Sequence, residues 1–335
     1  MSGHARGGND NFTGGGAQSS NIAYGDAGGD MSDFAKGGND GFTGGQQQSY
    51  GDAGGNMSGH AEGGDDTFAG AFLTPLATKT VYGDAGGDMS DFAKGGNDSF
   101  TTLGSFGNTF YGDAGGDMSG HARGGNDTFT GSLAGGNTFY GDAGGSMSGD
   151  AQGGDDVLLV QPGSPGAFSF ANLAYGDAVA MTGRAVGGSD SLTGGSNTGI
   201  GTSTVSNTLY GDAEFISGSA KGGDDTLIAG TAAAGSSVVN DIWGDGQLSD
   251  GAKGGKDLFV FRDEGSMTVG TQNTIEDFSQ SQRDRIEFSG VAGVQSFADL
   301  IITQIGNDTI ITAGADQVTL HNFTSALTAN DFLFV

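Results

Sequence analysis

The sequence contains no cysteine and only three prolines in 335 residues. Because cysteine is absent, neither disulfide bonds nor thiolate metal sites are available to this chain. Basic residues are also scarce, with 12 Lys and Arg against 40 Asp and Glu, and the formal net charge of −28 argues against nucleic acid and anionic lipid as partners. The first ten residues, MSGHARGGND, have no apolar segment of the kind found in cleaved signal peptides, and no stretch approaches the roughly 18 apolar residues of a membrane span. We therefore expect neither a cleaved export signal nor a membrane span.

Glycine, by contrast, fills 70 positions and recurs at fixed places in a repeated unit. The clearest copy is residues 111–131, YGDAGGDMSGHARGGNDTFTG. Successive copies begin 26 to 35 residues apart, at Tyr24, Tyr50, Tyr82, Tyr111, Tyr140, Tyr175, Tyr210 and Trp243. A period in this range indicates a stack of similar units, none of which can bury its apolar residues alone.

Each unit has three short segments that couple a glycine-rich turn to an apolar residue flanked by Thr or Ser. These segments have the size of strands and are too short and too rich in glycine for helices. Head-to-tail repetition of such segments is satisfied by coiling into stacked parallel strands. We predict an all-β fold in which residues 1–257 form a right-handed parallel β-roll or β-helix solenoid, with coils of either two or three sides.

The pattern changes after residue 257, where glycine becomes much less frequent. The patterns predict ordinary strands with one buried face at residues 258–261, 274–278, 285–288, 309–312, 317–320 and 331–335. Residues 294–300 (VQSFADL) are predicted to form a short helix. Residues 258–335 are therefore predicted to form a compact β-rich cap.

The nonapeptide at residues 122–130, ARGGNDTFT, resembles the G-G-x-G-x-D-x-U-x repeat of the repeats-in-toxin (RTX) family of calcium-binding parallel β-rolls. Gly125, Asp127 and Phe129 match its fourth, sixth and eighth positions, whereas Ala replaces the first glycine in every copy. Nine segments carry the central pattern, and their sixth position is Asp10, Asp40, Asp66, Asp98, Asp127, Asp156, Asp190, Asp225 or Asp257. The resemblance implies that these aspartates bind Ca²⁺.

Calcium is also favoured by the chemistry of the residues. It takes about six to eight oxygen ligands in flexible geometry, and a glycine turn presents backbone carbonyl groups beside an Asp carboxylate. The Gly-Asp elements add the candidate ligands Asp26, Asp52, Asp84, Asp113, Asp142, Asp177, Asp212 and Asp245. The next turn adds Asp30, Asp88 and Asp117, with Asn56 at the matching position of another copy. Two alternatives need no metal: Asx hydrogen bonds that cap turns, and a simply acidic, soluble or halotolerant surface.

Other chemistry finds little support in the sequence. His4, His60 and His121 recur at one position of the unit, but Phe34 and Phe92 occupy the same position in other copies, which argues against a transition-metal site. The sequence has no H-E-x-x-H or G-x-S-x-G motif. We therefore expect no enzymatic activity.

The tail resembles the C-terminal region of RTX proteins that use type I secretion, through residues 257–261 (DLFVF), 275–290 (IEDFSQSQRDRIEFSG), 296–300, 306–312 and the final DFLFV. That resemblance implies an uncleaved C-terminal export signal, type I export machinery as a partner, and a location outside a Gram-negative cell. A plain hydrophobic cap is the alternative, and both roles are compatible.

Together these observations predict a secreted, calcium-folded structural protein of a matrix, surface layer or filament. Its self-repelling charge keeps the chain disordered inside the cell, and calcium folds it outside. The first residues correspond to the second half of a unit, so unpaired strand edges favour head-to-tail assembly with other copies. The alternative function is a calcium-dependent secretion and folding module of a larger RTX enzyme, toxin or adhesin.

Overall fold

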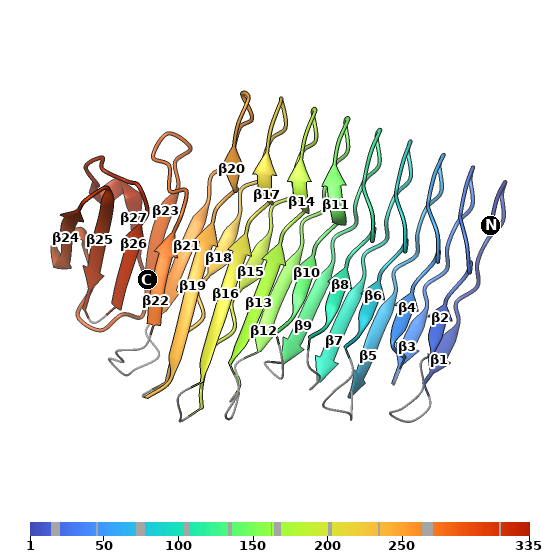
Figure 1. Cartoon of the computed structure of the whole chain (residues 1–335), viewed down its shortest axis with the longest axis horizontal. Coiled ribbons are helices and arrows are strands. Elements are labelled where there is room, and N and C mark those ends of the chain that lie inside the picture. Colours follow the sequence, from blue (N-terminus) through green and yellow to red (C-terminus); the bar gives the residue numbers. More distant parts are fainter. Residues whose placement is uncertain are drawn as a thin grey trace.

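The computed structural model describes all residues except 15–20, 45, 72–77, 104–106, 133–135, 162, 164–168, 200–202, 234, 263–270 and 315. The described chain is a stack of coils, with the strands following one another from the N-terminal end to the C-terminal cap (Figure 1). Each coil runs through three β-faces, and equivalent residues of neighbouring coils pair in register. The predicted all-β parallel solenoid is confirmed, and its coils are three-sided.

The first face is formed by the residues that follow each Gly-Gly turn. Its 11 strands in the described residues are β1 (Asn11–Thr13), β3 (Gly41–Thr43), β5 (Thr67–Ala71), β7 (Ser99–Leu103), β9 (Thr128–Ser132), β12 (Val157–Gln161), β15 (Ser191–Thr193), β18 (Thr226–Ile228), β21 (Leu258–Arg262), β23 (Arg285–Ser289) and β27 (Phe332–Phe334). All pair in parallel, so that Phe100 lies opposite Phe129. The first sheet therefore extends from the repeats into the cap without interruption.

The second face is formed by the residues that precede each Tyr-Gly-Asp element. Its 12 strands in the described residues are, in spatial order, β2 (Ile22–Tyr24), β4 (Gln48–Tyr50), β6 (Thr80–Tyr82), β8 (Thr109–Tyr111), β10 (Thr138–Tyr140), β13 (Phe170–Tyr175), β16 (Thr204–Tyr210), β19 (Ser237–Trp243), β22 (Thr271–Ile275), β26 (Asp316–Leu320), β25 (Asp308–Ala313) and β24 (Leu300–Ile305). Pairing is parallel as far as β26 and antiparallel between β26, β25 and β24. The C-terminal end of the stack is thus closed by an antiparallel meander.

The third face is the narrowest. Its strands in the described residues are β11 (Ala143–Met147), β14 (Ala178–Met181), β17 (Ala213–Ile216) and β20 (Gln247–Leu248), and earlier coils continue it as single parallel bridges such as Ala85↔Ala114 and Met89↔Met118. The loops that follow it project along one edge of the stack (top of Figure 1).

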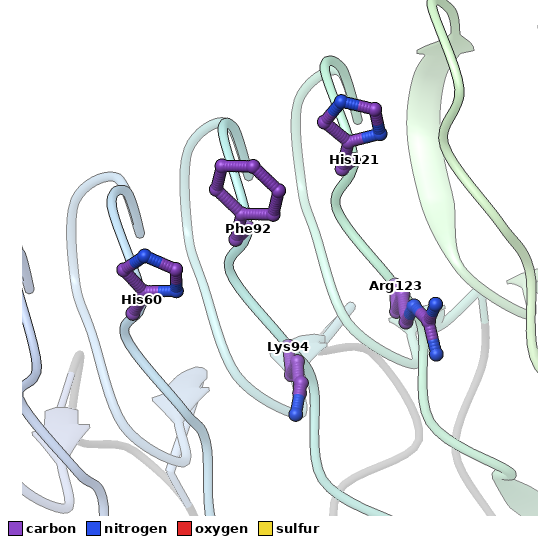
Figure 2. A pocket seen from close by; sticks show the side chains of 5 residues that line it. All are labelled: His60, Phe92, Lys94, His121 and Arg123. Carbon is purple, nitrogen blue, oxygen red and sulfur yellow. The ribbon is translucent and has the colours of Figure 1, made fainter.

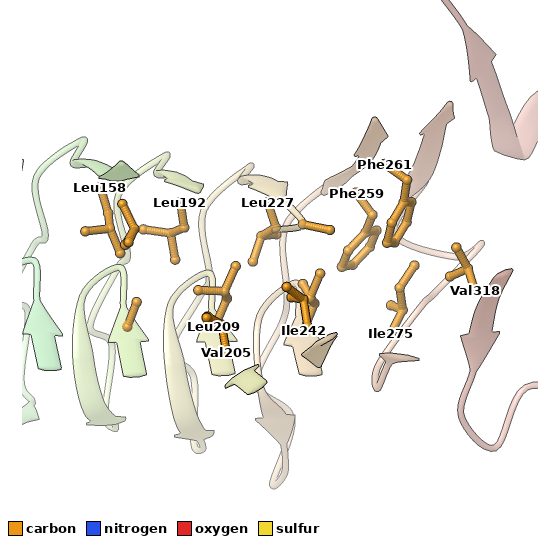
Figure 3. Packing of buried hydrophobic residues seen from close by; sticks show 14 of the residues in the cluster. Leu158, Leu192, Val205, Leu209, Leu227, Ile242, Phe259, Phe261, Ile275 and Val318 are labelled. Atoms are coloured by element: carbon orange, nitrogen blue, oxygen red, sulfur yellow. The ribbon is translucent and has the colours of Figure 1, made fainter. Parts of the chain in front are cut away.

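Two separate cores run along the solenoid. The larger one lies between the first and second faces, where Phe129 stacks on Phe100 with ring centroids 4.5 Å apart. Aliphatic side chains such as Leu158, Leu192 and Leu227 fill it in the following coils, before Phe259 and Phe261 (Figure 3). The smaller one fills the projecting loops with alanine and methionine, including Met118 and Ala122. Alanine in place of the first repeat glycine is therefore a core residue, because only a small side chain fits this narrow space.

The predicted cap strands occur at or near the expected positions, but the predicted helix over residues 294–300 is wrong. Only one 3₁₀ turn, η1 (Phe297–Asp299), forms there, and a second, η2 (Ala329–Asp331), precedes β27. The Asp299 carboxylate accepts hydrogen bonds from the backbone of Gln295 and Ser296, which closes a single turn. The β-branched residues that follow then favour the extended strand β24.

Candidate cation-binding aspartate ladders

The aspartates at the sixth position of the nonapeptide form a ladder along the solenoid axis, which is exposed at Asp10 and buried from Asp40 to Asp257. The backbone N–H of Asp98 donates to Oδ1 of Asp127, and that of Asp127 donates to Oδ1 of Asp156, each at 2.6 Å. The same bond recurs from Asp10 to Asp257 at 2.6 to 3.0 Å. Stacked identical turns place one carboxylate under the next backbone amide in every coil. We call this row the first ladder.

A second buried ladder is built by the Gly-Asp elements. In the clearest copy, Oδ1 of Asp113 accepts a 2.9 Å hydrogen bond from the backbone N–H of Gly125, across the interior of the coil. In the other copies, the backbone N–H of the glycine at the fourth position of the nonapeptide donates in the same way to the Gly-Asp aspartate. These aspartates are Asp26, Asp52, Asp84, Asp142, Asp177, Asp212 and Asp245. We call this row the second ladder.

Most of these carboxylates keep one oxygen without a hydrogen-bond donor. Among the described residues this holds for thirteen buried aspartates: Asp40, Asp52, Asp66, Asp98, Asp113, Asp127, Asp142, Asp156, Asp177, Asp190, Asp212, Asp225 and Asp257. Within the described residues, no ion pair joins any of these thirteen carboxylates to Lys or Arg. A buried carboxylate oxygen without a donor is costly, so each calls for a proton or a cation.

Backbone carbonyl oxygens lie close to these free carboxylate oxygens. A Cβ atom placed on Gly112 would lie 1.9 Å from Oδ2 of Asp127 and 1.8 Å from the carbonyl oxygen of Gly141, so those two oxygens are no more than 3.7 Å apart. A Cβ atom on Gly124 would lie 2.6 Å from Oδ2 of Asp113 and 1.6 Å from Oδ1 of Asp142. The space beside these glycines is therefore lined by oxygen atoms.

The electrostatics of the ladders oppose negative charge. Burial, followed by neighbouring carboxylates such as Asp113 and Asp156, raises the pKa of Asp127 well above its usual range. At the N-terminal end, where less of the ladder surrounds it, burial raises the pKa of Asp40 to about 6. The protein fold alone thus disfavours the ionised form of both ladders.

Side chains alone do not complete a metal site. Among the described residues no group of three or more His, Cys, Asp or Glu converges on a common metal position. Each coil offers a cation two carboxylates together with the neighbouring backbone carbonyl groups. This donor set suits a hard cation that accepts carbonyl ligands.

The third predicted set, Asp30, Asp88 and Asp117, lies elsewhere. These aspartates are exposed on the projecting loops, and their carboxylates accept backbone N–H bonds from the next coil, as from Asp117 to Asp88 at 2.9 Å. Asn56 takes part in the same row and accepts from the backbone of Asp88 at 2.8 Å. An asparagine serves this row as well as an aspartate does.

Two aspartates of the cap, Asp277 and Asp284, were missed by sequence reasoning. Asp284 continues the first ladder, with Oδ1 accepting from the backbone of Asp257 and Oδ2 from that of Ser279. Asp277 accepts from three consecutive backbone amides, those of residues 244 to 246, at 2.8 to 3.1 Å. Both oxygens of each carboxylate therefore have donors, unlike those inside the repeats. Their sequence signal is weak, because neither follows a Gly-Gly turn.

A buried asparagine ladder was missed as well. It lies on the second face and consists of Asn108, Asn137, Asn172, Asn207, Asn240 and Asn273. Amide groups bond directly along it, as from Nδ2 of Asn207 to Oδ1 of Asn240 at 2.8 Å. An amide carries both a donor and acceptors, so neighbouring asparagines can bond to each other as carboxylates cannot, although Nδ2 of Asn137 has no partner among the described residues.

Comparison of the sequence with protein-family models gives no match, and comparison with curated proteins gives no significant match. Within the described residues, no helical segment has the length and hydropathy required to cross a membrane. The structure itself shows a parallel β-solenoid with two stacked ladders of buried aspartates.

Proposed function

We propose that the two buried aspartate ladders bind Ca²⁺ and that the chain is a secreted structural protein that folds when calcium binds. One observation carries this proposal: successive coils bury a carboxylate oxygen that has no donor and that lies beside a carbonyl oxygen. Repeated in coil after coil, this arrangement favours a cation or a proton that neutralises the carboxylates.

The residues fit calcium better than other common metals. In the clearest copy, Oδ2 of Asp127 and the carbonyl oxygen of Gly141 form one pair of oxygens that would hold an ion, and Oδ2 of Asp113 and Oδ1 of Asp142 form another. Calcium accepts carboxylate and carbonyl ligands in flexible geometry, whereas magnesium requires a stricter octahedron and zinc prefers nitrogen and sulfur. Calcium binding also agrees with the resemblance of the nonapeptide to RTX repeats.

Calcium binding would couple folding to location. Where calcium is scarce, ionised aspartates repel one another and oppose coil formation, and where it is abundant they become ligands. A chain with this property can pass through a type I export channel unfolded and fold outside the cell. Once folded, the chain offers a stack of parallel strands, and end-to-end assembly with further copies stays a prediction.

Equilibrium dialysis of the full chain against Ca²⁺ at pH 7 tests the proposal, with Mg²⁺ at equal concentration as the competing ion. We expect several calcium ions per chain and little displacement by magnesium. Far-ultraviolet circular dichroism on the same samples should show β structure appearing with calcium. Failure to bind more than one calcium ion per chain, or equal binding of magnesium, would overturn the proposal.

A further inference from the structure

The projecting loops form a continuous ridge with two different sides. We call this ridge, which includes residues 114–123 of one coil and their equivalents, the fin. In that coil the chain turns at Gly120, with φ of +72°, and the fully buried side chains of Met118 and Ala122 fill the space between the two legs of the loop. Asp117 and Ser119 lie on the first leg, and His121 and Arg123 lie on the second.

The second leg of the fin carries stacked rings and basic side chains. His4, Phe34, His60, Phe92 and His121 stack in series with centroids 4.9 to 5.1 Å apart. Two residues further on, the aligned positions are Arg6, Lys36, Glu62, Lys94, Arg123, Gln152, Val186, Lys221 and Lys253. This row holds six of the 12 basic residues in the chain. Figure 2 shows Lys94 and Arg123 of this row beside His60, Phe92 and His121, and these five residues line one groove.

The first leg of the fin is acidic. A separate groove there is lined by Asp30, Asn56, Asp88 and Asp117 together with a row of serines. Backbone amides of the next coil fix the orientation of these carboxylates. The two grooves share no residue, and the Ala–Met core lies between them.

Both rows contribute one residue per coil, so both have the pitch of stacked β-strands. A partner that places one charge opposite each side chain must repeat at the same pitch, and a second stacked β-solenoid does so. We propose that copies of this chain associate side by side, with the basic leg of one fin against the acidic leg of the next. Because the two surfaces differ, the contact is heterologous, and each copy keeps one free leg to which a further copy can bind.

The exposed basic row could also attract a nucleic acid, but the geometry favours a second copy. The faces of the rings are covered by their neighbours in the stack, so bases have no exposed ring face on which to stack. Beyond His121 the row continues with Asp150 and Arg184, which form a two-point ion pair with each other. Nearer the N-terminus Lys36 pairs with Glu62, so Lys94 and Arg123, which line the groove, are the basic side chains that this proposal assigns to a partner.

Sedimentation velocity and electron microscopy of the full chain in about 10 mM calcium, at low and high NaCl, test this proposal. We expect concentration-dependent association that widens the particles across the solenoid axis and is lost at high salt. Lys94→Glu/Arg123→Glu should abolish it. Asp88→Asn/Asp117→Asn should also weaken it, and Asn56 shows that asparagine keeps the backbone bonds.

Two further variants make the result specific. Asp65→Asn/Asp155→Asn changes the net charge equally in another exposed row that already contains Asn97 and Asn126, and it should associate as the natural chain does. A variant with Ser90→Lys/Ser119→Lys added to Asp88→Asn/Asp117→Asn has two basic legs, and it should associate only when mixed with Lys94→Glu/Arg123→Glu. Circular dichroism confirms that each variant is folded.

The proposal is overturned if the folded natural chain stays monomeric at low salt, or if the Asp65/Asp155 control loses association as fully as the fin variants. Growth only along the solenoid axis, unaffected by the fin variants, would show end-to-end contacts instead. Binding of single-stranded DNA without self-association would assign the basic row to nucleic acid. Each of these measurements requires only that the protein is folded. The outcome therefore does not depend on which ion makes the chain fold.

Discussion

Asp98 donates its backbone N–H to Oδ1 of Asp127 at 2.6 Å, while Oδ2 of Asp127 has no donor among the described residues. One half of the carboxylate thus holds two coils together, and the other half is left for a ligand. In the cap, Asp284 has backbone donors on both oxygens. The chain therefore supplies donors to both oxygens at the cap end of the ladder and leaves one oxygen without a donor inside the repeats.

Asp156→Asn tests one position of the first ladder, and its neighbour Asp155 gives a matched control. Asparagine keeps the oxygen that accepts from Asp127 but removes the charge that would bind calcium. With a Kd of about 1 mM per site, we expect the loss of one site to remove roughly 1.4 kcal/mol of stabilisation at about 10 mM calcium. Urea unfolding with and without calcium measures this difference.

Asp155 is exposed, so Asp155→Asn should change the free energy of unfolding by less than about 0.5 kcal/mol. Equal calcium dependence in both variants would show that Asp156 binds no ion.

Acid should partly replace calcium. Burial raises the pKa of Asp40 to about 6, and burial together with neighbouring carboxylates raises the pKa values of Asp98 and Asp127 well above their usual range. Groups with raised pKa values bind more protons in the folded state, so the folded state of the metal-free protein gains stability as pH falls from 7 toward about 4 and loses it as pH rises. Circular dichroism of metal-free protein across this range should show β structure increasing toward acid, and a decrease would contradict the account.

Gly125→Ala tests the close stacking of the turns. A Cβ atom at this position would lie 1.4 Å from the carbonyl oxygen of Gly96, so backbone must move to admit it. We expect a loss of about 3 kcal/mol in thermal or urea unfolding of the calcium-loaded protein. Gly29→Ala is the control, because no atom lies within 4 Å of the added Cβ and the cost should stay below about 1 kcal/mol. Similar unfolding of both variants would argue against the observed stacking.

Phe129→Ala tests the main core. This ring is 2% exposed and stacks between its equivalents in the first sheet, so its removal should cost about 3 to 5 kcal/mol. Phe92 is 48% exposed on the fin, and Phe92→Ala should cost less than about 1 kcal/mol. Chemical unfolding of the two variants side by side distinguishes a core ring from a surface ring.

The repeat made much of the fold predictable. Because each unit carries the same residues at the same places, Tyr82 had to lie opposite Tyr111 and the phenylalanines had to stack in an interior. The number of sides was not predictable, since it depends on how each coil closes. That closure brings Gly125, 12 residues from Asp113 in sequence, within hydrogen-bonding distance of it.

The aspartates show where sequence reasoning stops. Asp113, Asp117 and Asp127 all lie in glycine turns and read alike, yet Asp113 and Asp127 are buried and Asp117 is exposed. Which way each side chain points is set by the packing of three faces, and no local pattern encodes it. Asp284 was missed for a different reason, because it extends the first ladder from a segment that lacks the repeat.

The most direct test of calcium-dependent folding is far-ultraviolet circular dichroism of the natural chain at pH 7 in excess chelator, followed by stepwise addition of Ca²⁺. We predict a spectrum without β structure in chelator and a cooperative rise of β signal once calcium exceeds the chelator. A full β spectrum that persists in chelator at neutral pH, unchanged by added calcium, would contradict the account.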